Sequence, residues 1–61
     1  MIYGDNIIKG RANNIQCDGL SDITDLPSFA ETWKLKPMST CLCAEDSSVY
    51  TMKSDGTWSK L

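Results

Sequence analysis

The stretch STCLCAEDSSVYTMKSDGTWSKL, residues 39–61, specifies most of the architecture. It holds short runs rich in β-branched and aromatic residues at 39–44, 49–52 and 57–61, and polar turn residues separate these runs. Runs of this length and composition are typical of neighbouring antiparallel strands. We therefore predict a three-stranded antiparallel β-meander over residues 39–61.

The second turn of this meander has the clearer sequence signal. The segment 53–57, KSDGT, suits a type I turn in which Gly56 takes a left-handed conformation and forms a bulge. This geometry predicts a positive φ angle at Gly56. It also places Met52 opposite Trp58.

The first turn contains no glycine, and we place a two-residue tip at 46–47, with Cys43 opposite Tyr50 and Cys41 opposite Met52. Strand alternation then divides the apolar side chains between two faces. One face holds Cys41, Cys43, Tyr50, Met52 and Trp58, and the other holds Leu42, Ala44, Val49, Thr51 and Leu61. A sheet covered on one side only should have one polar face. We therefore expect the N-terminal half to cover one face and a further surface to cover the other.

The preceding residues have weaker patterns. Dense turn residues in 1–19 delimit short apolar runs, so we expect weak strands or extended arms there, at 6–9 and 13–17. Residues 20–38 are expected to form a loop or a short helix, which begins again at Pro27 and ends at Pro37. The expected fold is one small domain, 1–61, that is mostly β, with a small α+β arrangement also open.

Length and charge restrict the function. A 61-residue domain buries only about 60% of the surface of its unfolded chain, so domains of this size usually need a disulfide, a metal or oligomerisation. Six basic residues are scattered and the net charge is −2, which argues against a nucleic-acid partner. No apolar stretch approaches the length of a membrane span, and no secretory signal is evident.

Catalytic chemistry has little support in this composition. The chain has no histidine, which is the commonest general base and metal ligand. The carboxylate pairs Asp22 with Asp25 and Glu45 with Asp46 lie in caps and turns, where such residues usually act structurally. No glycine-rich phosphate loop occurs. We therefore predict no catalytic residue, no cofactor and no small-molecule substrate.

The cysteines Cys17, Cys41 and Cys43 are odd in number, which fits a paired disulfide framework poorly. Cys41 and Cys43 point the same way on a strand and could both reach one ion. A structural zinc site normally has four ligands, and Cys17 is the only further thiolate. We predict no metal site, with the thiols packed as small apolar side chains. A thiolate metal site remains the third alternative.

The large side chains near the end of the chain are candidates for a contact surface. Trp33, Tyr50 and Trp58 could form a stacking platform for a ligand, but a domain this small needs its largest apolar side chains for packing. Together with Met52 and Leu61, they are the candidate assembly or core interface.

A resemblance to a known class of proteins covers residues 25–61. Asp25-Leu26-Pro27, a strand opening at Ser39, and the segments 46–50 (DSSVY) and 55–61 (DGTWSKL) resemble a recurring segment of small virion proteins of tailed bacteriophages. The resemblance implies a compact β-meander that assembles or decorates heads, tails or fibres. The sequence departs at 36–38, KPM, where such proteins tend to have a glycine before the strand.

The resemblance implies a structural subunit located in the virion. Its expected partners are copies of itself, with a trimer favoured, and other virion proteins. It does not distinguish a position in the head, neck, tail or fibre. The alternative function is a small soluble protein-binding module or inhibitor that is not part of a virion.

Overall fold

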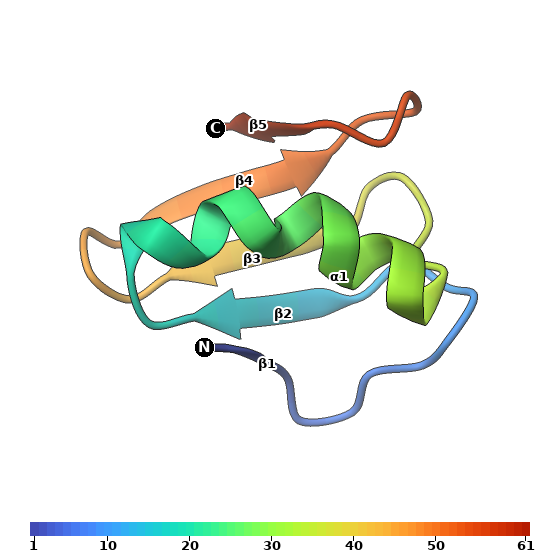
Figure 1. Ribbon diagram of the computed structural model, residues 1–61, viewed down its shortest axis with the longest axis horizontal. Coiled ribbons are helices and arrows are strands. Elements are labelled where there is room, and N and C mark those ends of the chain that lie inside the picture. The colour runs from blue at the N-terminus through green and yellow to red at the C-terminus, as the bar shows by residue number, and fades with distance from the viewer.

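A computed structural model describes residues 1–61 and contains one five-stranded sheet with a helix on one side (Figure 1). The strands are β1 (Ile2–Tyr3), β2 (Asn14–Cys17), β3 (Thr40–Cys43), β4 (Ser48–Met52) and β5 (Trp58–Lys60). They lie side by side in chain order. Strands β2 and β3 are parallel, and the other neighbours pair antiparallel. A 3₁₀ helix, η1 (Leu20–Asp25), and the α-helix α1 (Leu26–Trp33) connect the parallel pair.

The predicted fold class is confirmed, because the chain is mostly β with a short helical segment. The meander over residues 39–61 forms as β3, β4 and β5. Met52 lies opposite Trp58, and Gly56 has a φ angle of 88°, as the bulged turn requires. Asp55 closes this turn by accepting hydrogen bonds from the amide of Thr57 at 3.0 Å and from its hydroxyl at 2.6 Å.

The register of the first hairpin was predicted wrongly. Cys43 lies opposite Ser48 and Cys41 opposite Tyr50, so the pairing is shifted by two residues on β4. The turn is longer than predicted because Asp46 accepts hydrogen bonds from the amide and hydroxyl of Ser48, at 3.1 and 2.6 Å, which holds the chain in a wider loop. A shift of two residues keeps the alternation, so every strand side chain stays on its predicted face.

Of the two strands predicted in the N-terminal part, the one at 13–17 is confirmed and the one at 6–9 is wrong. Strand β2 forms within the predicted 13–17, but 6–9 is a loop, and the edge strand is β1. The Asn13 side chain holds this loop, since its Oδ1 accepts the Ile8 amide at 2.8 Å and its amide nitrogen donates to the Ile8 carbonyl at 2.9 Å. These local hydrogen bonds replace the strand pairing that the apolar pair at 7–8 suggested.

Helix α1 begins at Leu26, one residue before the predicted start. A following proline disfavours helical backbone, yet Leu26 has φ −58° and ψ −44°. Its side chain is completely buried, and this burial offsets the steric cost. Pro27 lies in the first turn, where its missing amide hydrogen leaves no helical hydrogen bond unmade.

The helix ends at Trp33, before the proline that was predicted to stop it. Lys34 takes a left-handed conformation with φ 55°, and its amide donates to the Glu31 carbonyl at 3.3 Å. The Leu35 amide donates to the Ala30 carbonyl at 2.9 Å, which completes a Schellman motif. Leu35 and Ala30 are both buried, so the same turn that ends the helix also closes this end of the core.

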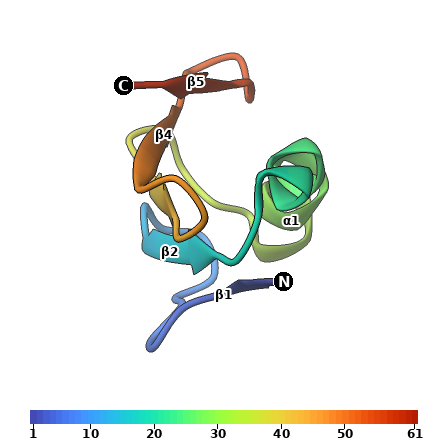
Figure 2. The ribbon, with the colours of Figure 1, turned by 90° about the vertical axis from the view of Figure 1, so that its left-hand side faces the viewer.

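The core lies between α1 and one face of the sheet, which bends around the helix (Figure 2). Its buried apolar side chains are Ile15, Cys17, Leu26, Ala30, Leu35, Cys41 and Cys43. Helix α1 therefore covers the face to which strand alternation assigned the strand cysteines.

Candidate functional site

The opposite face of the sheet has no helix or strand over it (Figure 2). The strand register and alternation place the following side chains on this outer face: Tyr3, Asn14, Gln16, Thr40, Leu42, Val49, Thr51, Ser59 and Leu61. Leu61 continues the ladder beyond β5, since its amide donates to the Val49 carbonyl at 2.8 Å. Every side chain of the outer face is exposed or half-buried.

Two rows of side chains cross the outer face. The register aligns Tyr3, Gln16, Leu42, Val49 and Leu61 in one row, and Asn14, Thr40, Thr51 and Ser59 in the next. The first row is mainly apolar, and Leu42 near its centre is 42% exposed. The second row is polar, and within it the Thr40 hydroxyl donates to Asn14 Oδ1 at 2.6 Å.

The outer face carries no charged side chain, although 23% of the chain is Asp, Glu, Lys or Arg. Depletion of charge together with aromatic residues such as Tyr is typical of the centre of a protein interface. The outer face is therefore an uncharged and partly apolar surface that no helix or strand of the chain covers.

The residues proposed from sequence as an interface are divided by the fold. Tyr50, Met52 and Trp58 lie on the helix side, partly buried against the core. Trp33 lies on α1, where its ring centroid is 6.2 Å from that of Phe29. Only Leu61 belongs to the outer face.

Sequence reasoning did not select the other apolar residues of the outer face as site residues. Strand alternation had assigned Leu42 and Val49 to this side of the meander, and it was the sequence signal that could have identified them as site residues. Tyr3 gave no signal, because β1 has only two residues and joins the sheet by pairing with β2, far along the chain.

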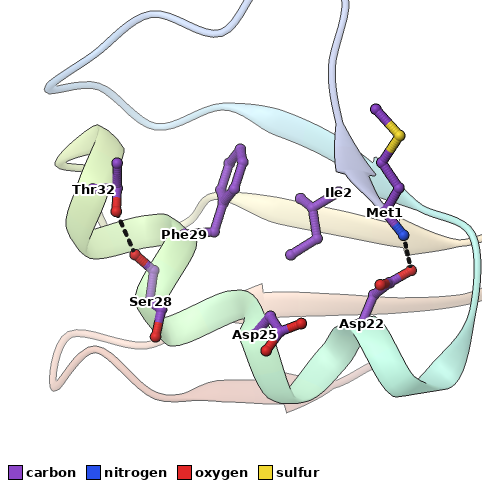
Figure 3. A pocket seen from close by; sticks show the side chains of 7 residues that line it. All are labelled: Met1, Ile2, Asp22, Asp25, Ser28, Phe29 and Thr32. Atoms are coloured by element: carbon purple, nitrogen blue, oxygen red, sulfur yellow. Dashed lines mark hydrogen bonds and ion pairs between the residues drawn. The ribbon is translucent and has the colours of Figure 1, made fainter.

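An open groove of about 340 Å³ lies between the N-terminus and the helical segment (Figure 3). Its lining residues are Met1, Ile2, Asp22, Asp25, Ser28, Phe29 and Thr32. The Asp22 carboxylate pairs with the amine of Met1 at 2.5 Å and accepts the Gly19 amide at 3.1 Å. Asp22 is thus the capping residue that its position predicted.

The lowered pKa values of three carboxylates in the caps and turns determine how the stability of the fold should depend on pH. The N-terminal amine and the Gly19 amide lower the pKa of Asp22, and the hydroxyl and amide of Ser48 lower the pKa of Asp46. The hydroxyl and amide of Thr57 do the same to the pKa of Asp55. Each carboxylate therefore stabilises the fold at a pH above its unfolded pKa, about 3.9.

We expect the unfolding free energy to be nearly constant from pH 7 to about pH 5 and to fall as the pH drops through the lowered folded-state pKa values. Urea unfolding at a series of pH values measures this. The Asp46→Asn variant should show a shallower loss of stability in acid, because it cannot be protonated. Equal stability of the natural protein at pH 6 and pH 3 would contradict the prediction.

The three thiols lie together in the core. Cys17 is opposite Cys43 in the parallel pairing of β2 with β3, and Cys41 lies two residues before Cys43. Burial raises the pKa of Cys17 to about 12, and the neighbouring Cys41 and Cys43 thiols act in the same direction. No group of three or more His, Cys, Asp or Glu side chains is placed to hold a metal ion. All three thiols are completely buried within the apolar core.

All three thiols are buried, so they should be unreactive towards reagents in the folded protein. We expect N-ethylmaleimide at pH 8 to leave the folded chain unmodified over an hour and to add three times after unfolding in urea. Intact-mass spectrometry counts the adducts. Rapid addition of one adduct without denaturant would show that a thiol is accessible and would contradict this packing.

Comparison of the chain with models of protein families, with curated proteins and with solved structures finds no match. None of its helices has the length and apolar character needed to cross a membrane.

Proposed function

We propose that the protein is a structural subunit of a tailed-bacteriophage virion, in the head, tail or fibre, and that it acts through protein–protein contacts rather than catalysis. The observation that carries this proposal is the uncharged outer face. A small domain that has already buried one face of its sheet under a helix exposes the other, with Leu42 and Val49 near its centre. Exposed apolar side chains grouped in this way mark protein interaction sites.

The virion part of the proposal draws its support from the resemblance over residues 25–61. The residues that carry the likeness build the two hairpin turns, since Asp46 binds the backbone and side chain of Ser48 and Asp55 binds those of Thr57. They also include Leu26 at the start of α1. These residues hold the turns of the meander, which is the part of the chain on which the resemblance rests.

A soluble binding module is the second candidate, and the groove of Figure 3 favours it. The groove is open to solvent and contains the carboxylate of Asp25, which could receive a basic side chain of a partner. Such a module would work away from the virion.

Mass spectrometry of phage particles purified on a density gradient tests the proposal, using a strain in which a phage or prophage carries the gene. We expect its peptides to sediment with the particles in a constant ratio to the major structural proteins. A replication protein of the same phage serves as the control and should stay in the soluble fraction. Peptides found only in the soluble fraction would overturn the proposal and favour the binding module.

A further inference from the structure

We infer that the end of the molecule at which α1 stops binds a short single-stranded nucleic acid, through four basic side chains and the indole of Trp33. The inference goes beyond the proposed function, because it adds a different class of partner at a surface other than the outer face.

The fold gathers basic residues that are separated in the sequence. The Gly10 amide donates to the Trp33 carbonyl at 3.0 Å, and the Lys36 amide donates to the Arg11 carbonyl at 3.2 Å. These two hydrogen bonds hold the loop before β2 against the loop after α1 (Figure 1). The two loops carry four of the six basic residues of the chain: Lys9, Arg11, Lys34 and Lys36. We call these four residues and Trp33 the basic patch.

The basic patch removes the objection that the sequence raised to a nucleic-acid partner. That objection rested on the scatter of the basic residues along the chain, and the folded surface brings most of them together. Concentrated positive charge is what releases counterions from a phosphate backbone.

The four cations of the basic patch are available to an anion. All four side chains are exposed, and the ion pairs of the molecule involve the N-terminal amine and Lys60 instead. Two acidic residues, Asp5 and Glu31, lie close along the chain to these loops, and neither forms an ion pair with a cation of the patch.

Most other carboxylates lie too far away to cancel this charge. Strands β2 and β3 begin at the two basic loops and run along the longest dimension of the molecule, 27 Å (Figure 1). Four acidic residues lie at or beyond the far ends of these strands: Asp18, Asp22, Glu45 and Asp46. Charges in solution are screened over about 8 Å at physiological ionic strength, so an anion at the basic patch experiences mainly its cations.

Trp33 favours a nucleic acid over an acidic protein as the partner. It is the last residue of α1, it is 37% exposed, and its carbonyl joins the two basic loops. A nucleic-acid base can stack on an exposed indole while neighbouring basic side chains contact the phosphates. The carboxylates of an acidic peptide would meet the cations but offer nothing for the indole to stack on. Because the bases of a duplex are already stacked on one another, the strand must be single.

The size of the patch predicts a short contact that depends strongly on salt. The molecule measures 23 by 16 Å across its longest axis, so this end can contact about four nucleotides, the lower limit for single-strand-binding domains. Four phosphate contacts give a slope of about −3 for the logarithm of the binding constant against the logarithm of salt concentration. The affinity should therefore fall about 50-fold between roughly 50 and 200 mM salt.

Fluorescence anisotropy of a labelled thymidine oligonucleotide of about 12 nucleotides tests this inference. Lys36→Glu should weaken binding about tenfold at roughly 50 mM salt, because it removes one phosphate contact. The matched control is Lys60→Glu, which makes the same change in net charge. The Lys60 Nζ lies 4.0 Å from an oxygen of Asp46, at the opposite end of the molecule, so this variant should bind as the natural protein does.

A second measurement reports on the contact at Trp33 itself. The chain has two tryptophans, so Trp58→Phe leaves Trp33 as the only indole, and its emission should be quenched as the oligonucleotide binds. Trp33→Phe leaves Trp58, whose emission should stay constant during binding because its ring packs against the core.

Several results would overturn the inference. These are no binding at about 1 mM protein in low salt, equal binding by the Lys36→Glu and Lys60→Glu variants, or binding that leaves the Trp33 emission unchanged. A duplex of the same length bound as tightly as the single strand would also overturn it. Tighter binding to polyglutamate or to vesicles of anionic phospholipid would show that the basic patch recognises a different class of partner.

Discussion

The Leu26→Ala variant should lose about 2–5 kcal/mol of unfolding free energy, the usual cost of truncating a fully buried leucine. Leu26 has no exposed side-chain surface and joins α1 to the buried strand residues of the core. A domain of 61 residues has a total stability of only about 3–9 kcal/mol. The variant should therefore lose a large part of its stability and unfold at a much lower urea concentration than the natural protein.

The matched control for this prediction is Leu20→Ala, because Leu20 precedes α1 in the same helical segment but is 42% exposed. The Leu20→Ala variant should lose no more than about 0.5 kcal/mol of unfolding free energy, as for most surface substitutions. Urea unfolding followed by far-ultraviolet circular dichroism compares the two variants. Similar losses in both would show that the core is not centred on Leu26.

Truncation of Trp58 should have the second large effect. Trp58, a candidate core or interface residue, is half-buried on the helix side beside Met52 and packs against the core. We expect Trp58→Ala to cost about 3 kcal/mol, the lower end of the range for large aromatic residues. Trp33→Ala should cost less, because Trp33 is 37% exposed and its ring lies beside that of Phe29 on the same helix.

A second substitution distinguishes the contribution of the Trp58 ring to stability from that of its indole nitrogen. The indole Nε1 is buried and has no hydrogen-bond acceptor, and an unpaired buried donor costs about 1–3 kcal/mol. Trp58→Phe removes this donor and keeps an aromatic ring. We expect its thermal midpoint to lie near that of the natural protein and well above that of Trp58→Ala. A Phe variant as unstable as the Ala variant would mean that Nε1 makes a stabilising hydrogen bond.

Local sequence predicted the three strands of the C-terminal meander and its second turn, but not the register of its first hairpin. Its strands are short, and its second turn contains Asp55 and Gly56 at the positions that the backbone needs. The positive φ of Gly56 and the pairing of Met52 with Trp58 followed from one turn. The error in the first hairpin had a local cause, because the hydrogen bonds of Asp46 with Ser48 widen a turn that has no glycine.

The N-terminal half could be predicted only in part. The short strand within 13–17 has alternating apolar residues, but nothing in its composition shows that it pairs in parallel with β3 rather than with its own neighbours. That pairing depends on η1 and α1, which bury Leu26 and Ala30 and bring β2 beside β3. Strand β1 depends still more on the rest of the fold, because it has two residues and one partner strand.

The candidate site could also be predicted only in part from the sequence. Alternation of side chains is a property of extended backbone, so the sequence alone assigned Leu42 and Val49 to one face and the strand cysteines to the other. Which face is covered depends on where α1 packs, and that follows from contacts between residues distant in the chain. The uncharged outer face joins residues from β1 to β5, and the core thiols join β2 to β3. Such surfaces exist only when long-range packing brings separate strands together.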